Sequence, residues 1–387
     1  MTATSRLNRN FWTNRKTIEA IAIVVIALFV MFALPLLLSD FRLKLLGRFL
    51  SLTIAALGID LIWGYTGMLS LGHGLFFALG GYALAMHTNL QLPDGQMPEF
   101  FMLYGVSDLP IFWKPFASFP FTAIAIFTIP AIIAGLLGYL IFRNRIRGVY
   151  FSILTQAALI VFFNFFNGQQ KLINGTNGLK TDTEMMFGVL MSSPEAQIAF
   201  FRVSVLLLVA GYLLCRWLTS GRFGRLLIAI RDDESRVRFS GYDPTGFKVL
   251  VFAISGALAG IAGALYTAQS GIITPSAMEV STSIEMVIWV AVGGRATLVG
   301  AVLGTLLVSY ARTFLSEEFP AVWLFFQGAL FLIVVTALPD GLMGLIRDRA
   351  WPFIQNRLGL TPVVPFPSLT NPEVEYEHQQ LDSDDNA

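Results

Sequence analysis

Few ionisable side chains lie inside the apolar runs of this sequence, and one of them is an acid. Glu285 lies near the start of the run 284–293. A carboxylate is costly in such a run unless a cation pairs with it or water reaches it, so Glu285 is a functional candidate. Arg295 or Arg312 could be its partner, although a place at the wet end of the run would explain the acid equally well.

A glycine-rich segment supplies the next candidates. Residues 64–74 read Gly-Tyr-Thr-Gly-Met-Leu-Ser-Leu-Gly-His-Gly, so Thr66, Ser70 and His73 lie where glycines accumulate. Each glycine costs an exposed helix about 1 kcal/mol relative to alanine, which predicts a break in the helix. A similar segment, 289–295, lies in the second half. Such paired breaks point to a path for a solute, whereas close packing through small residues is the alternative; for His73 alone, a hydrogen-bonded interior role is the simpler interpretation.

Polar side chains also interrupt the apolar run 149–167. They are Thr155, Gln156, Asn164 and Asn167. Amides in such a run can hydrogen-bond a neutral solute or tie neighbouring helices together. The second role is the simpler one for any single residue, and Gln156 and Asn164 are kept as candidates for the path.

Motifs of enzymes are absent from the sequence. The nearest approach to a nucleotide-binding loop is 241–248, where Phe247 stands in place of the required lysine. The histidines, His73, His87 and His378, do not have zinc-site spacing. We therefore expect no catalytic residues, no metal and no cofactor, and any energy from ATP must come from a partner.

The elements that position these residues follow from composition. Of the 387 residues 55% are apolar and only 13% are charged, which a soluble domain of this size could not sustain. The net charge of +1 argues against a nucleic-acid partner. A membrane-spanning helix needs about 20 mostly apolar residues. The apolar runs are 18–38, 45–63, 68–87, 118–142, 149–166, 198–218, 247–268, 284–293, 296–312 and 321–338. We predict an all-α, polytopic transmembrane bundle of about ten spans, with an interrupted segment in each half that suggests two related halves.

The basic residues orient the spans. With the N-terminus inside, arginines gather in the inner connections, at 143–147 and 216–248, and after the last span. The outer connections 88–117 and 167–197 hold only Lys114, Lys171 and Lys180. This asymmetry follows the positive-inside rule and predicts cytoplasmic termini. Arg42, Lys44 and Arg48 fall at an outer connection, so either the second span starts late or that corner packs against protein.

The same reading divides the chain into three parts. Residues 1–17 form a cytoplasmic N-terminal tail, and residues 18–345 form the transmembrane domain. Residues 346–387 are polar, rich in proline and acidic at the end, so we expect a mostly disordered cytoplasmic tail.

The cytoplasmic loop 219–246 predicts a short amphipathic helix. Leu226, Leu227, Ile230 and Val237 form an apolar stripe. Asp232 precedes Arg236, and Glu234 precedes Arg238, by four residues, which is the favourable order on a helix. Gly241 stands where a C-terminal cap belongs. The helix could rest on membrane lipid or dock a soluble partner, and the pattern alone does not choose between them.

Several segments of this sequence resemble the ABC-importer permeases of the branched-chain amino acid type. The loop resembles their coupling loop at 221–225 (Gly-Arg-Phe-Gly-Arg), at 229–234 (Ala-Ile-Arg-Asp-Asp-Glu) and at Gly241; further matches are 64–67, 69–73, 175–179 and 255–266. The resemblance implies a non-enzymatic importer subunit of the bacterial inner membrane. It also implies a second permease subunit, ATP-binding cassette ATPase subunits and a periplasmic solute-binding protein as partners. Residues that would couple to the ATPase are Arg222, Arg225, Arg231, Asp232, Glu234 and Gly241.

Within this family the chain most resembles the second permease subunit of urea importers. That resemblance rests on residues 168–178 and 283–295, and it implies urea as the solute. Branched-chain amino acids are the alternative. A zwitterion needs charged partners, and ionisable residues in the spans are few, which favours a neutral solute. A stand-alone channel for small polar solutes is the more distant alternative. The outer insertion 88–117 departs from the family pattern; it could widen the contact with the binding protein, or it could have no function.

Overall fold

The computed structural model describes residues 21–92, 96–320, 322, 325–326, 328–329, 332, 336 and 340–346. In these residues nearly all regular structure is helical. After a first helix, Ile21–Leu37, the main helices are α2 (Asp40–Thr66), α3 (His73–Asn89), α5 (Phe119–Arg143), α6 (Val149–Gly168), α8 (Pro194–Ser220), α9 (Arg222–Phe239), α10 (Pro244–Ser270), α11 (Val280–Gly293) and α12 (Leu298–Glu318).

Short elements complete the chain. They are α4 (Glu99–Leu103), η1 (Lys114–Ala117), α7 (Gln170–Ile173), η2 (Gly175–Asn177), η3 (Pro275–Met278) and α14 (Gly341–Leu345). Four two-residue strands form two antiparallel pairs, β1 (Leu179–Lys180) with β4 (Ile272–Ile273) and β2 (Met185–Met186) with β3 (Val189–Leu190).

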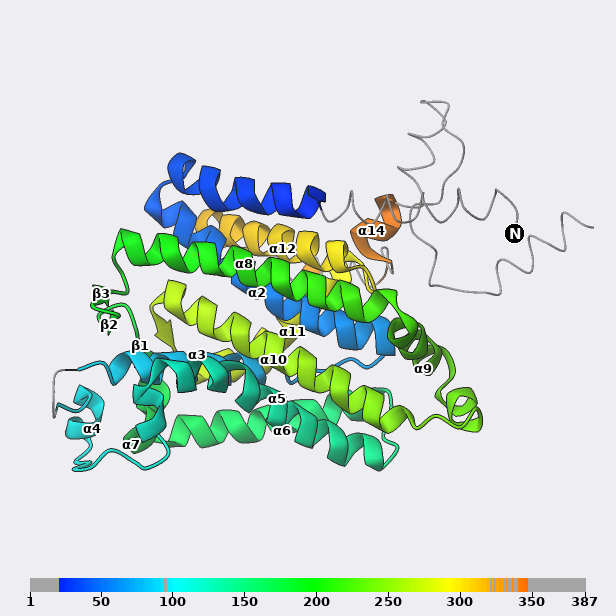
Figure 1. The fold of residues 1–387 in the computed structure, drawn as a ribbon, viewed down its shortest axis with the longest axis horizontal. Coiled ribbons are helices and arrows are strands. Elements are labelled where there is room, and N and C mark those ends of the chain that lie inside the picture. The colour runs from blue at the N-terminus through cyan, green and yellow to red at the C-terminus, as the bar shows by residue number, and fades with distance from the viewer. Residues whose placement is uncertain are drawn as a thin grey trace, which may run out of the picture.

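The long helices run side by side along the long axis of the molecule (Figure 1). α9 lies at one end of this bundle, and α4, α7 and strands β1 to β3 lie at the opposite end. Among the described residues, six helices are long and apolar enough to cross a membrane, and the first helix and α11 are shorter apolar helices. The predicted fold class, a helical membrane bundle, is confirmed.

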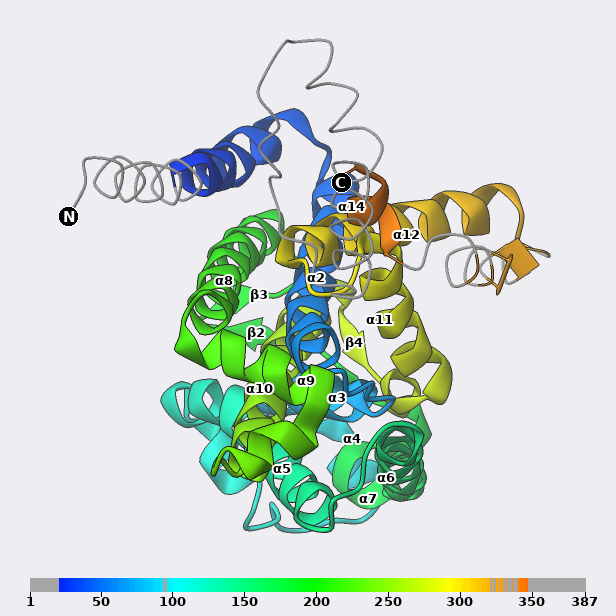
Figure 2. The same cartoon turned by 90° about the vertical axis from the view of Figure 1, so that its right-hand side faces the viewer.

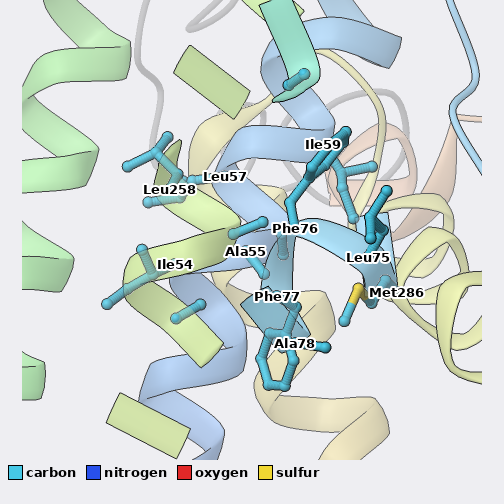
Figure 3. Packing of buried hydrophobic residues seen from close by; sticks show 14 of the residues in the cluster. Ile54, Ala55, Leu57, Ile59, Leu75, Phe76, Phe77, Ala78, Leu258 and Met286 are labelled. Carbon is cyan, nitrogen blue, oxygen red and sulfur yellow. The ribbon is translucent and has the colours of Figure 1, made fainter. Parts of the chain in front are cut away.

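Three helices form the centre of the bundle. α3 is buried at all but one of its 17 residues. α2 is buried over 78% of its most apolar stretch and α10 over 61%, whereas α6 is buried over only 22%. Viewed from the α9 end, α5, α6, α8, α11 and α12 surround this centre (Figure 2). Apolar side chains of α2, α3, α10 and α11 meet in one cluster, which includes Ile54, Phe76, Leu258 and Met286 (Figure 3). The peripheral helices therefore present apolar faces outward, as a membrane protein requires.

Glycines bring α3 and α10 into backbone contact. A Cβ atom at Gly80 would overlap the carbonyl group of Gly260, and one at Gly263 would overlap that of Phe77. Small residues at these positions permit the dispersion contacts that hold helices together where lipid removes the hydrophobic driving force. For these glycines the packing interpretation accounts for their presence.

Polar contacts join the C-terminal end of α10 to the first half of α2 and to α8. Gln269 of α10 donates from Nε2 to Ser51 Oγ of α2 (3.1 Å) and to Ser204 Oγ of α8 (2.9 Å). Arg48 Nε donates to the Gln269 carbonyl at the end of α10 (3.2 Å). Arg48, one of the three basic residues at this corner, thus packs against protein, and the helix that carries all three begins at Asp40.

Nine of the ten predicted spans coincide with helices. The tenth, 321–338, lies mostly outside the described residues. The predicted tail 1–17 lies wholly outside them, and so does the predicted tail 346–387 apart from its first residue. The span predicted at 68–87 begins later in the structure, because residues 67–72 are not helical and α3 begins at His73. Gly67 ends α2 in the left-handed region at φ 73°, which a glycine adopts without strain.

Substituting Gly80 by alanine should destabilise the bundle by about 1–3 kcal/mol, the range typical of overpacked cores. The new Cβ must displace the Gly260 carbonyl, so α3 and α10 must separate. Thermal unfolding of the purified protein in detergent would measure the effect.

Gly135→Ala is the matched control, because a Cβ at Gly135 would meet only the Cβ atom of Ala253 at 3.6 Å, an ordinary contact. Equal melting temperatures for the two variants would contradict the packing role of Gly80.

Candidate transport path and coupling loop

The glycine-rich segment 64–74 forms a break between two helices, as the sequence predicted. α2 ends at Thr66, residues 67–72 run as an irregular loop, and α3 begins at His73. Because lipid offers no hydrogen bonds, irregular backbone at this depth must be satisfied by protein or by a water-filled cavity.

Side chains of neighbouring helices satisfy this loop. Ser152 Oγ donates to the Leu69 carbonyl (2.6 Å), and the Leu71 amide donates to Thr155 Oγ1 (3.1 Å). Both side chains come from α6. Thr155, which the sequence grouped with the amides of this span, therefore stabilises the break by direct contact.

The contacts of His73, the first residue of α3, show that α3 begins near the middle of the bundle. Its Nε2 lies 2.6 Å from Ser255 Oγ, which itself donates to the Gly58 carbonyl of α2 (2.6 Å). Because the single hydroxyl proton of Ser255 is used toward Gly58, His73 Nε2 is the donor in the first contact. Ser255 lies close to halfway along α10. In this structure His73 has the interior hydrogen-bonded position that the sequence favoured for it.

A second helix begins at the same place. The Gly74 amide donates to Ser283 Oγ in the first turn of α11 (3.1 Å). α11 follows a folded-back segment, 271–279, which includes β4 and η3. From this meeting point α3 runs to the β1 end of the bundle, where Asn89 donates to the Lys180 carbonyl. α11 runs the other way, to the turn before α12. The N-termini of two short helices thus meet inside the bundle, and each carries a partial positive charge.

Glu285 lies two residues beyond this meeting point and is paired. Arg312 Nη1 of α12 donates to both carboxylate oxygens of Glu285 at 2.6 Å. Glu285 is buried, while the side chain of Arg312 is 46% exposed. Of the two partners that the sequence offered, the structure selects Arg312; the Arg295 guanidinium lies over the Trp63 ring, 5.3 Å from its centroid.

The remaining path candidates are Thr66, Ser70, Gln156 and Asn164, and three of them bond within their own segments. Thr66 is buried and bonds the Ile62 carbonyl one turn earlier in α2. Ser70 is buried in the loop and accepts from the Gly72 amide (3.3 Å). Gln156 is half-buried on α6, and Asn164 is exposed there and bonds its own helix at the Ile160 carbonyl (2.9 Å). The two polar candidates of α6 thus differ from Thr66 and Ser70, which are buried.

Sequence reasoning missed a buried acid, Asp60, on α2. Its Oδ1 accepts from the Ala296 amide at 2.7 Å, and the residue is fully buried. Tyr65 Oη donates to the carbonyl of the same Ala296 (3.2 Å). The signal was present in the sequence, because Asp60 interrupts the run 45–63 just as Glu285 interrupts its own run.

The predicted amphipathic helix is α9, and it is bent. Asp233 has non-helical backbone angles (φ −154°, ψ 96°) and divides the helix in two. Its side chain accepts from the amides of Ser235 (2.9 Å) and Arg236 (3.2 Å), so it caps the second part. Gly241 follows the helix in the left-handed region at φ 87°, where a C-terminal cap was predicted.

Glu234 holds the second part of α9 to the bundle. It is buried and contacts three cations: Arg238 of its own helix (2.9 Å), Lys248 of α10 (2.9 Å) and Arg147 of the α5–α6 connection (3.0 Å). Burial alone would raise the pKa of Glu234, but the hydrogen bond and charge of Lys248, with Arg238 and Arg147, hold the pKa below its usual value. The predicted pair with Arg238 is present, and Glu234 faces inward.

The other predicted pair, Asp232 with Arg236, is not formed. Arg236 pairs with Asp233 (3.0 Å), and Asp232 pairs with Arg231 (3.1 Å), because the bend at Asp233 removes the regular four-residue spacing. Of the remaining coupling candidates, Arg222, Arg225 and Gly241 are exposed, and Arg231 turns toward α2.

The surface of α9 also carries an open groove of about 390 Å³. Apolar and charged residues line it, among them Leu226, Ala229, Val237, Asp232 and Arg236. This surface and the exposed arginines are available to a partner.

Comparisons with known proteins identify the family. A family model described as the permease component of branched-chain amino acid transport systems matches residues 41–335. The chain is 25% identical to the high-affinity branched-chain amino acid transport system permease protein LivM of Salmonella typhimurium, over 87% of this chain and 77% of the relative. It is 26% identical to LivM of Escherichia coli (76% and 68%) and 22% identical to the ribose import permease protein RbsC of Haemophilus influenzae (56% and 67%). No solved structure matches.

The chain belongs to the branched-chain amino acid permease family of ABC importers. It is a multi-pass inner-membrane permease subunit, not an enzyme, as its sequence predicted. A permease component is one part of a transport system, so the chain works with other subunits. The coarser part of the family resemblance is confirmed, while the closer resemblance to urea permeases finds no support in these relatives.

Replacing Glu234 by glutamine should destabilise the protein at neutral pH by about 3–5 kcal/mol, the range for breaking a buried ion pair. A carboxylate whose pKa is lowered in the folded protein stabilises the fold at pH values above its usual pKa of 4.5. This contribution is lost as the pH falls through the lowered pKa of the folded state. The difference in melting temperature between wild type and Glu234→Gln should therefore shrink as the pH falls below 4.5 and through the folded pKa of Glu234.

Asp243→Asn is the control, because Asp243 is 72% exposed and asparagine can still cap α10 by accepting from the Thr245 amide. Its effect should stay below about 1 kcal/mol. A Glu234→Gln effect equally small at pH 7 would contradict the anchoring role.

Proposed function

We propose that this chain is one of two permease subunits in an ATP-driven importer, and that its solute is a branched-chain amino acid. The observation that carries the choice of solute is the similarity to LivM across 87% of the chain. Urea, which the closer sequence resemblance implied, is not named for any of the relatives described above.

The polar groups at the meeting point of α3 and α11 are compatible with this solute. The N-termini of two short helices favour a carboxylate through their partial positive charges. Glu285 and its partner Arg312 lie beside this point on α11 and α12. Apolar residues of the same helices, Leu75 and Met286, supply a surface that suits an aliphatic side chain (Figure 3). In the closed packing seen here Gly74 and Ser283 are in contact, so entry of a solute requires α3 and α11 to separate.

ATP hydrolysis takes place in separate ATP-binding cassette subunits, and a periplasmic binding protein delivers the solute. α9, with the coupling loop 219–246, is the docking element for the ATPase. Its exposed arginines Arg222 and Arg225 and the groove on its surface support this role. Because Glu234 is buried, its part is to fix α9 to the permease rather than to contact the ATPase.

Uptake measurements decide the solute. In a strain that lacks this gene, expression of the chain should restore uptake of labelled leucine, and excess isoleucine should compete while urea should not. The same strain with an empty vector is the control. Restored uptake of labelled urea without leucine uptake would replace the proposed solute.

The orientation in the membrane is the second part of the proposal. Both termini and α9 lie in the cytoplasm, and residues 88–117 and 167–197 lie outside. Single cysteines at Ser107 and Thr183, in a Cys215→Ala background, should react with an impermeant thiol reagent in intact cells. A cysteine at Ser220 should react only after lysis. All three positions are exposed, so burial would not mask a site. The reverse pattern would overturn the orientation.

A further inference from the structure

Gly64, near the end of α2, is the point where three segments distant in sequence meet. Its carbonyl accepts from Arg231 Nη1 of α9 at 3.1 Å. On its other side, a Cβ atom would overlap the backbone of Ala296, in the turn between α11 and α12. A side chain longer than hydrogen at residue 64 would therefore force these segments apart.

The side chain of Arg231 closes the end of α2. Its Cγ lies so near Gly67 that a Cβ on Gly67 would come within 2.9 Å of it. The guanidinium thus lies at the C-terminus of α2, where free carbonyl groups and the helix dipole favour a cation. The side chain is only 19% exposed, so it is held in this position.

Side chains of α2 bond the turn between α11 and α12. Asp60 Oδ1 accepts from the Ala296 amide (2.7 Å), and Tyr65 Oη donates to the Ala296 carbonyl (3.2 Å). The backbone amide and carbonyl of Ala296 are thus both bonded by side chains of α2. Ala296 itself has φ 57°, an uncommon conformation for a residue with a side chain, so the turn is fixed in a specific shape.

α11 connects this joint to the meeting point with α3. It is a 14-residue helix, and at 1.5 Å per residue it spans about 21 Å. One end adjoins the turn held by Asp60 and Tyr65, and the other carries Ser283, which contacts Gly74. A displacement of the turn therefore moves the residues at the start of α3.

The bend at Asp233 separates two tasks within α9. The part after the bend is anchored by Glu234 to α10 and to the α5–α6 connection. The part before the bend carries Arg231 and reaches α2. The two parts of α9 thus contact different segments of the bundle.

We infer that Arg231 is the positioning residue that transmits movement of α9 to the transport path, through Gly64 and the Asp60–Ala296 contact, to α11. The inference rests on the proposed function, because α9 must dock the ATPase. Arg231 acts through backbone of α2 and does not touch the solute.

The test uses the full importer reconstituted in liposomes, with solute uptake and ATP hydrolysis measured on the same preparation. Arg231→Ala should lower the uptake per ATP hydrolysed about tenfold, within the range of typical coupling free energies. Arg231→Lys, which keeps a cationic donor, should recover most of it. Arg143→Ala is the control, because this arginine at the end of α5 is exposed and its side chain donates to Tyr139 of its own helix. Its ratio of uptake to hydrolysis should equal that of wild type.

An unchanged ratio in Arg231→Ala, or a lysine variant no better than alanine, would overturn the inference. A merely structural role would lower uptake and hydrolysis in parallel and leave the ratio unchanged, so that outcome counts against it too. If wild type itself shows no ATP-dependent uptake of leucine, the proposed function fails instead, and the two failures are distinguishable.

Discussion

The rest of this structure depends on how the backbone of residues 67–72 is satisfied. In the apolar core of a membrane an unpaired amide or carbonyl costs several kcal/mol, so a broken helix needs partners from its neighbours. Ser152 and Thr155 of α6 supply them for this loop, and Ser283 of α11 accepts from the Gly74 amide in the first turn of α3. These partners also fix where α3 and α11 begin. The placement of two helix N-termini inside the bundle is thus a consequence of satisfying one short loop.

The sequence predicted the helices well, because apolar runs of sufficient length have one stable form in lipid. It also predicted the break at 64–74, since glycine density is a local signal. The contacts across the break could not be predicted, because Ser152 and Ser283 are distant in sequence and a serine in a span has many possible roles. Asp60 could have been predicted, because it interrupts the apolar run 45–63 as Glu285 interrupts the run 284–293. The longer and more regular run around Asp60 made this acid less conspicuous.

The loop 219–246 shows where local reasoning on charge fails. Spacing of four residues predicted two ion pairs, and the pair of Glu234 with Arg238 forms. The pair of Asp232 with Arg236 does not, because Asp233 caps a new helix and interrupts the period. Sequence spacing also gave no sign that Glu234 is buried among cations of α10 and the α5–α6 connection. Burial is a tertiary property, and here it places Glu234 against the bundle rather than on its surface.

In the proposed coupling, α9 must both stay attached to the permease and transmit movement to α2. The part after the bend carries the attachment through Glu234, and the part before the bend carries Arg231, which contacts α2. An anchor must resist displacement, which three charge contacts on a buried carboxylate achieve. A transmitting contact must be strong yet able to move with its partner, and one guanidinium on the end of α2 has that character. The non-helical residue at Asp233 divides α9, so the contacts of Glu234 and the contact of Arg231 with α2 lie on separate helical segments.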